Sequence, residues 1–233
     1  MEEKTLRREV ATCCRLAEYL GLFDFSGHAS ARIPGAEVMF INSRNSVRSN
    51  IMLKDIIKVN VRENDVKKGP KAPQEIHIHS AIYRHRPDVN AVAHLHSPAV
   101  IALSVAGKKC LPVIQRGCHF AGGVPEYDDS RVVNSLDRGK ALAKTLGQRR
   151  AVILRGHGSV VVAESVKSLL FYSLFLELNA RYQLAAFQAG QQPRLLQKEA
   201  ILEGNQPHGQ RFFEKVWDYY VEKASAKPAS RAL

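Results

Sequence analysis

The sequence predicts a single α/β domain, because helix-like and strand-like segments alternate along most of its 233 residues. Hydrophobic residues make up 45% of the chain and charged residues 24%, the proportions of an ordinary globular protein. A chain of this length buries a sizeable core without metal or disulfide staples, so any bound metal is expected to serve function. Because no internal repeat or linker interrupts the pattern, residues 1–233 are treated as one domain.

The amino-terminal half begins with a helix over residues 3–21, where apolar residues recur at helical spacing and Gly21 acts as a stop signal. A second helix is expected to open just after Pro73 and to end at Pro87. In order, the elements expected after the first helix are a turn running into a strand at 25–33, strands at 38–42 and 56–61 separated by a polar stretch at 43–50, a charged turn at 62–65, a helix at 74–86, a strand at 91–96 and a short helix at 98–106.

The carboxy-terminal half contains the longest apolar helical pattern, which predicts a helix over residues 164–189. Two strands flank the Gly156-His157-Gly158 turn. The elements expected in this half are a strand starting at 113–114, a loop at 122–130, a helix at 136–146, strands at 151–154 and 160–162, the long helix, an amphipathic piece at 212–221 and a frayed end rich in Lys, Ala, Ser and Pro.

The net charge of +12 raises the question of a nucleic-acid partner. The basic residues are spread along the chain, however, and the densest groups, Lys67-Lys68-Lys71 and Arg84-His85-Arg86, are short. No zinc-finger or RNP-like pattern accompanies them. A small anionic substrate is therefore expected in place of a nucleic acid, although a merely solvated surface would give the same composition.

The sequence offers no sign of export or membrane insertion. No window of about eighteen apolar residues exists, and the charged start MEEKTLRREV lacks the apolar region of a signal peptide. The four cysteines form no CxxC pattern. Reduced thiols in the cytoplasm are the expectation.

Two histidines lie two residues apart in the predicted strand at 91–96. Side chains at i and i+2 of a strand share one face, about 7 Å apart, so the imidazoles of His94 and His96 can close on one divalent ion. A pair of hydrogen-bonded histidines in the core or at its rim would show the same spacing. His157, between two glycines that let the backbone approach a site closely, would complete a set of three imidazoles typical of catalytic zinc. A Gly-His-Gly sequence also suits a plain hairpin turn.

Glu75 opens the predicted helix after Pro73, where the helix dipole favours a carboxylate. His79 follows four residues later on the same helical face. Capping of the helix is a sufficient reason for an acidic residue at this position. Beside three metal-binding histidines, the same residue would become an acid or base.

These segments together resemble the class II aldolase/adducin family. The resemblance covers about residues 7–189, leaving 190–233 as a helical tail. It rests on four segments: Phe25-Ser26-Gly27-His28-Ala29-Ser30-Ala31-Arg32, Gln74-Glu75 to His79 with the following Tyr83-Arg84-x-Arg86-Pro87-Asp88-Val89, Ala91-Val92-Ala93-His94-Leu95-His96-Ser97-Pro98, and Leu154-Arg155-Gly156-His157-Gly158-Ser159-Val160-Val161-Val162.

The resemblance implies an α/β/α three-layer domain with a central, mostly antiparallel sheet. It implies that His94, His96 and His157 bind one divalent ion per subunit, with Glu75 as a further ligand or as the acid/base. Imidazole suits Zn, Mn, Fe or Co equally well, so the metal is left open. The family also implies a homotetramer with active sites near subunit interfaces. The tail aromatics Trp217, Tyr219 and Tyr220 of a neighbouring subunit could close such a site. Packing of a helix explains these aromatics equally well.

The chain departs from the sugar-phosphate aldolases of this family in the residues that would bind phosphate. His28 replaces the Asn of the Ser-Gly-Asn loop, the stretch 42–48 lacks the Thr-Gly turn, and Pro73-Gln74 replaces a Ser pair before Glu75. Proline has no N–H to offer a phosphate. A non-phosphorylated carboxylate is therefore the expected substrate. Arg44 is a further cation that could bind the carboxylate. Both Arg44 and Arg48 could equally be solvated surface residues. The expected substrate contacts are Ser26, Gly27, His28, Ser43, Arg48 and Arg116.

The sequence thus predicts a metal-dependent carbon–carbon lyase that stabilises an enolate, most simply a decarboxylase of a small hydroxyaromatic or oxo acid. Glu75 is the first candidate acid/base, with His79 and Tyr127 as further catalytic candidates and His28 and His119 as weaker ones. An aldolase that cleaves a hydroxy-oxo acid is the alternative. An iron-dependent oxygenase and an adducin-like binding domain without catalysis are further alternatives.

Overall fold

A seven-stranded mixed sheet lies at the centre of the computed structural model, which describes residues 2–64 and 69–226. The strands follow the order β3-β2-β1-β4-β7-β6-β5. Neighbouring strands are antiparallel except for the parallel pair β5–β6, so the expectation of a mostly antiparallel sheet is confirmed. The strands are β1 (His28–Arg32), β2 (Val38–Asn42), β3 (Ile56–Asn60), β4 (Ala91–Leu95), β5 (Glu126–Tyr127), β6 (Ala151–Leu154) and β7 (Gly158–Ala163).

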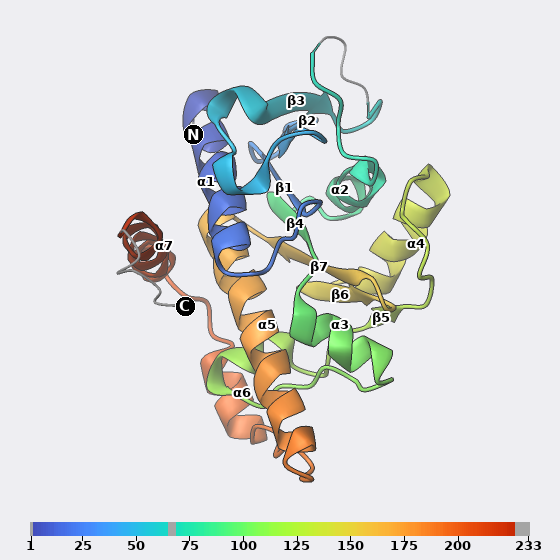
Figure 1. Cartoon of the computed structure of the whole chain (residues 1–233), viewed down its shortest axis with the longest axis vertical. Helices are drawn as coiled ribbons and strands as arrows, with labels where there is room; N and C mark the ends of the chain where they lie inside the picture. Colours follow the sequence, from blue (N-terminus) through green and yellow to red (C-terminus); the bar gives the residue numbers. More distant parts are fainter. Residues whose placement is uncertain (1, 65–68, 227–233) are drawn as a thin grey trace, which may run out of the picture.

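Helices cover both faces of this sheet, which confirms the three-layer α/β/α arrangement. Helices α1 (Glu3–Tyr19) and α5 (Val166–Gln188) lie on one side, and α2 (Ile76–His85) and α4 (Leu136–Leu146) on the other (Figure 1). Successive strand side chains point to opposite faces. In β4, Ala91 and Ala93 therefore join the core under α1 and α5, whereas Val92 joins the core under α2 and α4.

The remaining helices lie outside these layers or at their ends. They are α3 (Pro98–Val105), α6 (Lys198–Gly204), α7 (Gln210–Ser225) and the 3₁₀ helices η1 (Arg48–Asn50), η2 (Leu53–Asp55) and η3 (Gln115–Phe120). Helix α7 contributes Phe213 and Trp217 to the core that contains α1 and α5. Trp217 therefore packs within its own chain. The division into a core at 7–189 and a tail at 190–233 stays a prediction.

Two expected elements differ from those observed. Residues 113–114 form no strand, because the N–H groups of Val113 and Ile114 donate to the Asn179 side chain of α5, at 2.9 and 3.3 Å, and the chain then enters η3. The expected loop at 122–130 contains β5, which pairs in parallel with β6. Neither a side-chain acceptor from a distant helix nor a two-residue strand leaves a local pattern in the sequence. Helix α6 lies within the tail that was expected to be helical, but its bounds were not predicted.

Some expectations concern residues that are not described. The end of the charged turn at 62–65, Lys67, Lys68 and the end of the tail at 227–233 lie outside the described residues. Among residues 2–64 and 69–226, no helix is both long and apolar enough to cross a membrane.

Candidate active site

His94 lies at the end of β4, fully buried on the face covered by α2. Its direct cross-strand partner on β1 is His28, and the two ring centroids are 5.0 Å apart. The Nδ1 of His94 lies 3.2 Å from the Ser159 carbonyl oxygen on β7. A carbonyl only accepts, so Nδ1 carries the hydrogen and Nε2 is the free nitrogen.

His96 lies one residue beyond β4 and is held by an acidic residue that the sequence did not reveal. Its Nδ1 lies 2.8 Å from Asp24 Oδ2 and 3.3 Å from the Ser26 hydroxyl. Donation to Asp24 leaves Nε2 bare, 3.1 Å from Nε2 of His94. This carboxylate–histidine pair is the support that metal-binding histidines usually have.

His157 comes from the turn between β6 and β7. Gly156 adopts a positive φ of 62°, which allows the turn to be tight and brings the imidazole back over the sheet. The ring centroid lies 5.0 Å from that of His94 and 5.4 Å from that of His96. The potential ligand atoms of the three histidines lie within 4.8 Å of one another. The structure therefore brings together the three residues predicted as ligands.

Glu75 lies at the amino end of α2 and faces the same cluster. Its Oε1 accepts the N–H of Val133 at 3.0 Å, and its Oε2 lies 3.3 Å from His94 Nε2 and 3.8 Å from His157 Nε2. Burial raises the pKa of Glu75, but its contacts with His94, the Val133 N–H and His157 together lower it to about 2. Glu75 is thus a carboxylate at neutral pH.

The donor set fits a divalent cation. Two bare imidazole nitrogens and a carboxylate oxygen converge, and a positive charge, either a proton or a metal ion, must lie between them to offset their repulsion. Burial is the largest factor that lowers the pKa of His96, and it lowers that of His157 to about 4. Neutral imidazoles are the form that binds metal. Three histidines with a nearby carboxylate match the ligand chemistry of Zn, Mn, Fe and Co sites.

A chain of hydrogen bonds leads from the core to the histidine opposite this cluster. The buried Tyr83 hydroxyl lies 2.8 Å from Ser30 Oγ. Ser30 Oγ lies 2.7 Å from His79 Nδ1, and His79 Nε2 lies 2.7 Å from His28 Nδ1. This chain fixes the orientation of the His28 ring. His79, predicted to be catalytic, lies behind His28 and positions it.

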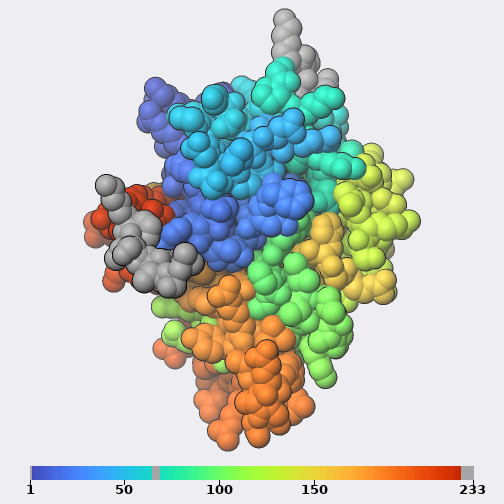
Figure 2. Space-filling model, viewed as in Figure 1, coloured from blue at the N-terminus to red at the C-terminus, as the bar shows by residue number. Residues whose placement is uncertain are grey.

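A cavity of about 320 Å³ opens beside the histidine cluster. Figure 2 shows segments coloured blue, teal and yellow-green meeting on the viewed face, the parts of the sequence that supply most of its walls. Gly27, Ser43 and His79, which were predicted to be in the site, are not part of the lining. The lining residues are Phe25, Ser26, His28, Arg44, Arg48, Pro73, Gln74, Glu75, His96, Val132 and His157.

The matching family model is that of the class II aldolase and adducin N-terminal domain, and it covers residues 8–184. The chain belongs to the class II aldolase/adducin family. A 3,4-dihydroxyphthalate decarboxylase from Arthrobacter keyseri is 31% identical over 198 residues, which cover 79% of each protein. Beta-adducin from Rattus norvegicus is 29% identical over 215 residues, 88% of this chain but 29% of that protein. An aldolase II superfamily protein from Pseudomonas syringae superposes with a TM-score of 0.83 at 25% identity, covering 95% of this chain and 92% of that chain.

Arg48 lines the cavity of this class II aldolase/adducin domain, but its hydrogen-bond donors are already engaged. Nε donates to the Gly27 carbonyl at 2.6 Å, Nη1 to the Ser46 carbonyl and to Ser46 Oγ, and Nη2 to the Ser26 and Arg44 carbonyls at 3.4 Å. The side chain is 5% exposed. Arg48 therefore ties together the two loops of the rim, and its predicted role in binding substrate directly is not supported by this geometry.

Three further residues proposed from the sequence lie away from the cavity. Tyr127 on β5 is 9% exposed and lies 3.5 Å from Asp129 Oδ2. The Arg116 guanidinium stacks over Phe212, 5.0 Å from the ring centroid, and His119 lies against Tyr172 of α5. None of the three is among the residues that line the cavity within this subunit.

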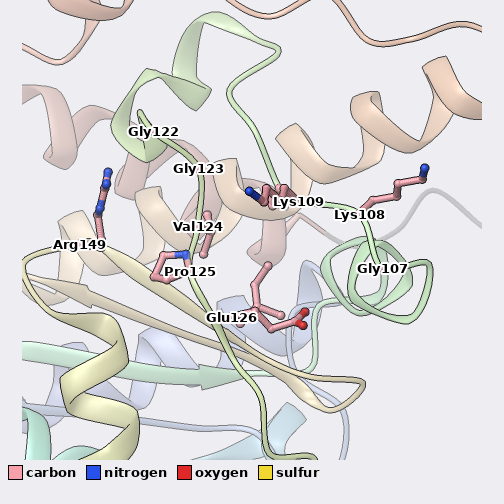
Figure 3. Close-up of a pocket in the computed structure, with 11 residues that line it drawn as sticks. Gly107, Lys108, Lys109, Gly122, Gly123, Val124, Pro125, Glu126 and Arg149 are labelled. Carbon is pink, nitrogen blue, oxygen red and sulfur yellow. The ribbon is translucent and has the colours of Figure 1, made fainter.

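A larger cavity of about 400 Å³ is lined by residues 107–110 and 122–126 together with Arg149 and Ile153. Figure 3 shows Lys108 and Lys109 on one segment and Arg149 on another, with Glu126 also in the lining. Glu126 accepts a hydrogen bond from Ser104 at 2.7 Å, and Ser104 Oγ accepts the N–H of Gly156 at 3.0 Å. This cavity lacks the histidine cluster, but its wall braces the turn that carries His157.

We expect Gly158→Ala to disrupt the centre, because β7 lies against β4 at this position. A methyl group there would collide with the Leu95 carbonyl oxygen and lie 3.0 Å from His96 Cδ2 and 3.3 Å from His94 Cε1. Overpacking of this kind costs about 1–3 kcal/mol. Thermal unfolding and bound-metal analysis should both reveal the loss. Gly209→Ala, where no atom lies within 4 Å, is the control; equal behaviour of the two variants would refute the prediction.

Proposed function

We propose that this chain is a divalent-metal-dependent carbon–carbon lyase that decarboxylates a small, non-phosphorylated hydroxyaromatic acid. The observation that carries the proposal is the convergence of His94, His96 and His157 beside the Glu75 carboxylate. Similarity to a 3,4-dihydroxyphthalate decarboxylase favours loss of carbon dioxide over aldol cleavage. Intact metal-binding side chains favour an enzyme over a binding domain of the adducin type.

In the proposed reaction, the three histidines would hold one ion per subunit, of Zn, Mn, Fe or Co. A bound divalent ion would supply charge that stabilises the negative oxygen developing on the substrate. Asp24 and the Ser159 carbonyl orient His96 and His94 through their Nδ1 hydrogens. The protein thereby presents Nε2 atoms to the ion in advance, with little reorganisation.

Glu75 would move the proton. Its carboxylate accepts the phenolic proton of the substrate and returns it to the ring carbon that bears the departing carboxyl group. The carbon–carbon bond then breaks, carbon dioxide leaves, and the electron pair stays with the ring, whose phenolate regains a proton from solvent. The Val133 N–H holds Oε1, so Oε2 is the oxygen available for this transfer. His28 lines the cavity and would hydrogen-bond a substrate oxygen through its Nε2.

The rim of the cavity suits a flat, apolar ring. Phe25 is 87% exposed and Val132 41% exposed, and both line the cavity together with Pro73. Exposed apolar side chains of this size are stabilised when a ligand or another subunit covers them. We propose a homotetramer in the cytoplasm, with sites near the subunit interfaces, in which Tyr127 and Arg116 of a neighbouring copy are candidates to complete the site.

The proposed function is tested by supplying catechol-type carboxylic acids to the full chain loaded with Zn, Mn, Fe or Co. We expect one carbon dioxide released per substrate consumed, measured by mass spectrometry of the dissolved gas. Cleavage of hydroxy-oxo acids without release of carbon dioxide would establish an aldolase in its place. Oxygen consumption by iron-loaded protein would identify an oxygenase, and inertness towards all of these acids would favour a binding domain.

A further inference from the structure

Arg44 lines the same cavity as His96 and His157, is exposed to solvent, and is anchored in a way that leaves its charge available. Its backbone N–H donates to the Lys71 carbonyl at 2.9 Å, and its side-chain Nε donates to the Ala72 carbonyl at 3.2 Å. The two bonds tie the loop after β2 to the segment that leads into α2. They fix the start of the guanidinium group and leave its two Nη atoms with four hydrogens to donate.

No acidic residue neutralises this guanidinium among the described residues. Glu75, the acidic residue of the cavity lining, is committed to Val133 and to the histidines. Arg48, the other cation of the lining, donates to backbone carbonyls. Arg44 is therefore the cation in the cavity lining whose two Nη groups have no hydrogen-bond partner among the described residues. An unpaired guanidinium with a fixed Nε is suited to accept a carboxylate in the bidentate geometry.

We propose that Arg44 is the specificity-determining residue of a second carboxylate subsite, so that the preferred substrate is an aromatic dicarboxylic acid. This inference rests on the proposed function of the same cavity. One carboxylate and the hydroxyl groups face the histidine cluster, where reaction occurs. The second carboxylate lies at Arg44 beside the Gln74 amide and is not lost. Phe25 and Val132 cover the ring between the two ends.

The size and chemistry of the lining favour this assignment over a phosphate group. A phosphate has more negative charge and more acceptor oxygens than the Arg44 guanidinium and the Gln74 side-chain amide can satisfy. Pro73, next to Gln74, has no backbone N–H to donate. A carboxylate is planar and matches the guanidinium edge. The cavity volume of about 320 Å³ is in the range of sites for single small ligands.

The subsite is tested by comparing aromatic dicarboxylates with monocarboxylates in the metal-loaded full chain. Calorimetry with phthalate and benzoate measures binding without requiring turnover, and steady-state kinetics with 3,4-dihydroxyphthalate and 3,4-dihydroxybenzoate measures selectivity. We expect the unmodified protein to prefer the dicarboxylates by about tenfold to a hundredfold. Arg44→Gln should abolish this preference by weakening dicarboxylate binding, and Arg44→Lys should restore it only in part.

Arg8→Gln is the matched control, because it removes one positive charge from an exposed site on α1. Equal preference ratios in Arg44→Gln and Arg8→Gln would overturn the subsite, as would an absence of preference in the unmodified protein. Carbon dioxide release with unchanged ratios would refute the subsite and leave the proposed function standing. Arg44-dependent phthalate binding without any release of carbon dioxide would support the subsite and refute the proposed decarboxylase.

Discussion

His94→Ala should abolish metal-dependent activity and remove bound metal from the protein. His94 is the central member of the cluster, since its Nε2 lies 3.1 Å from that of His96 and 3.3 Å from Glu75 Oε2. Metal at about one hundred times its dissociation constant stabilises the folded state by about 2.7 kcal/mol. The unmodified protein should therefore melt at a higher temperature when metal is added, and the variant should not.

The control for this experiment is His85→Ala, which removes an exposed imidazole from α2. Metal content after dialysis and the melting temperature with and without metal are measured for both variants. His85→Ala should retain the metal and its stabilising effect. If His94→Ala keeps one metal ion per chain and full activity, the proposed centre is wrong.

Glu75→Gln should retain the metal ion but lower kcat by about 10²- to 10⁴-fold, the usual contribution of an acid/base group. The amide oxygen of glutamine can still accept the Val133 N–H, so the amino end of α2 keeps its position. The amide cannot accept the phenolic proton. The expected signature is a loss of kcat with an unchanged metal content and a small change in KM.

Glu63→Gln, which makes the same substitution at an exposed position, is expected to behave like the unmodified protein. Rates of carbon dioxide release and metal content are compared in parallel. Loss of metal from Glu75→Gln would assign Glu75 as a ligand instead of an acid/base group. An unchanged kcat with bound metal would show that another residue transfers the proton.

Periodicity in the sequence was enough to predict most strands and helices, whereas the three-layer arrangement and the mostly antiparallel sheet were implied by the family resemblance. Strand alternation places His94 on the same face as Val92, and the Gly-His-Gly turn returns His157 to that face. The strand at 38–42 and the helix at 136–146 have the predicted bounds. These features depend on local patterns of apolar residues, which the sequence displays directly.

The parts that could not be predicted depend on contacts between distant segments. Asp24 supports His96 although the two residues are 72 positions apart in the sequence, and nothing local distinguishes Asp24 from a surface acid. Arg48 has the composition of a solvated loop residue, yet its side chain turns inward to bind carbonyl groups. Tyr127 and Arg116 lie on segments whose course is set by tertiary packing. Long side chains and nonlocal hydrogen bonds decide such positions.

The pairing of β4 with both neighbouring strands gives the metal centre a further consequence for how the chain folds. His94 lies opposite His28 on β1, and Leu95 opposite Ser159 on β7. A slip of one residue would turn His94 to the opposite face of the sheet and separate it from Glu75. An ion that binds only the correctly aligned strands draws the population towards that alignment. With the proposed ion bound, the native strand alignment alone would gain this stabilisation.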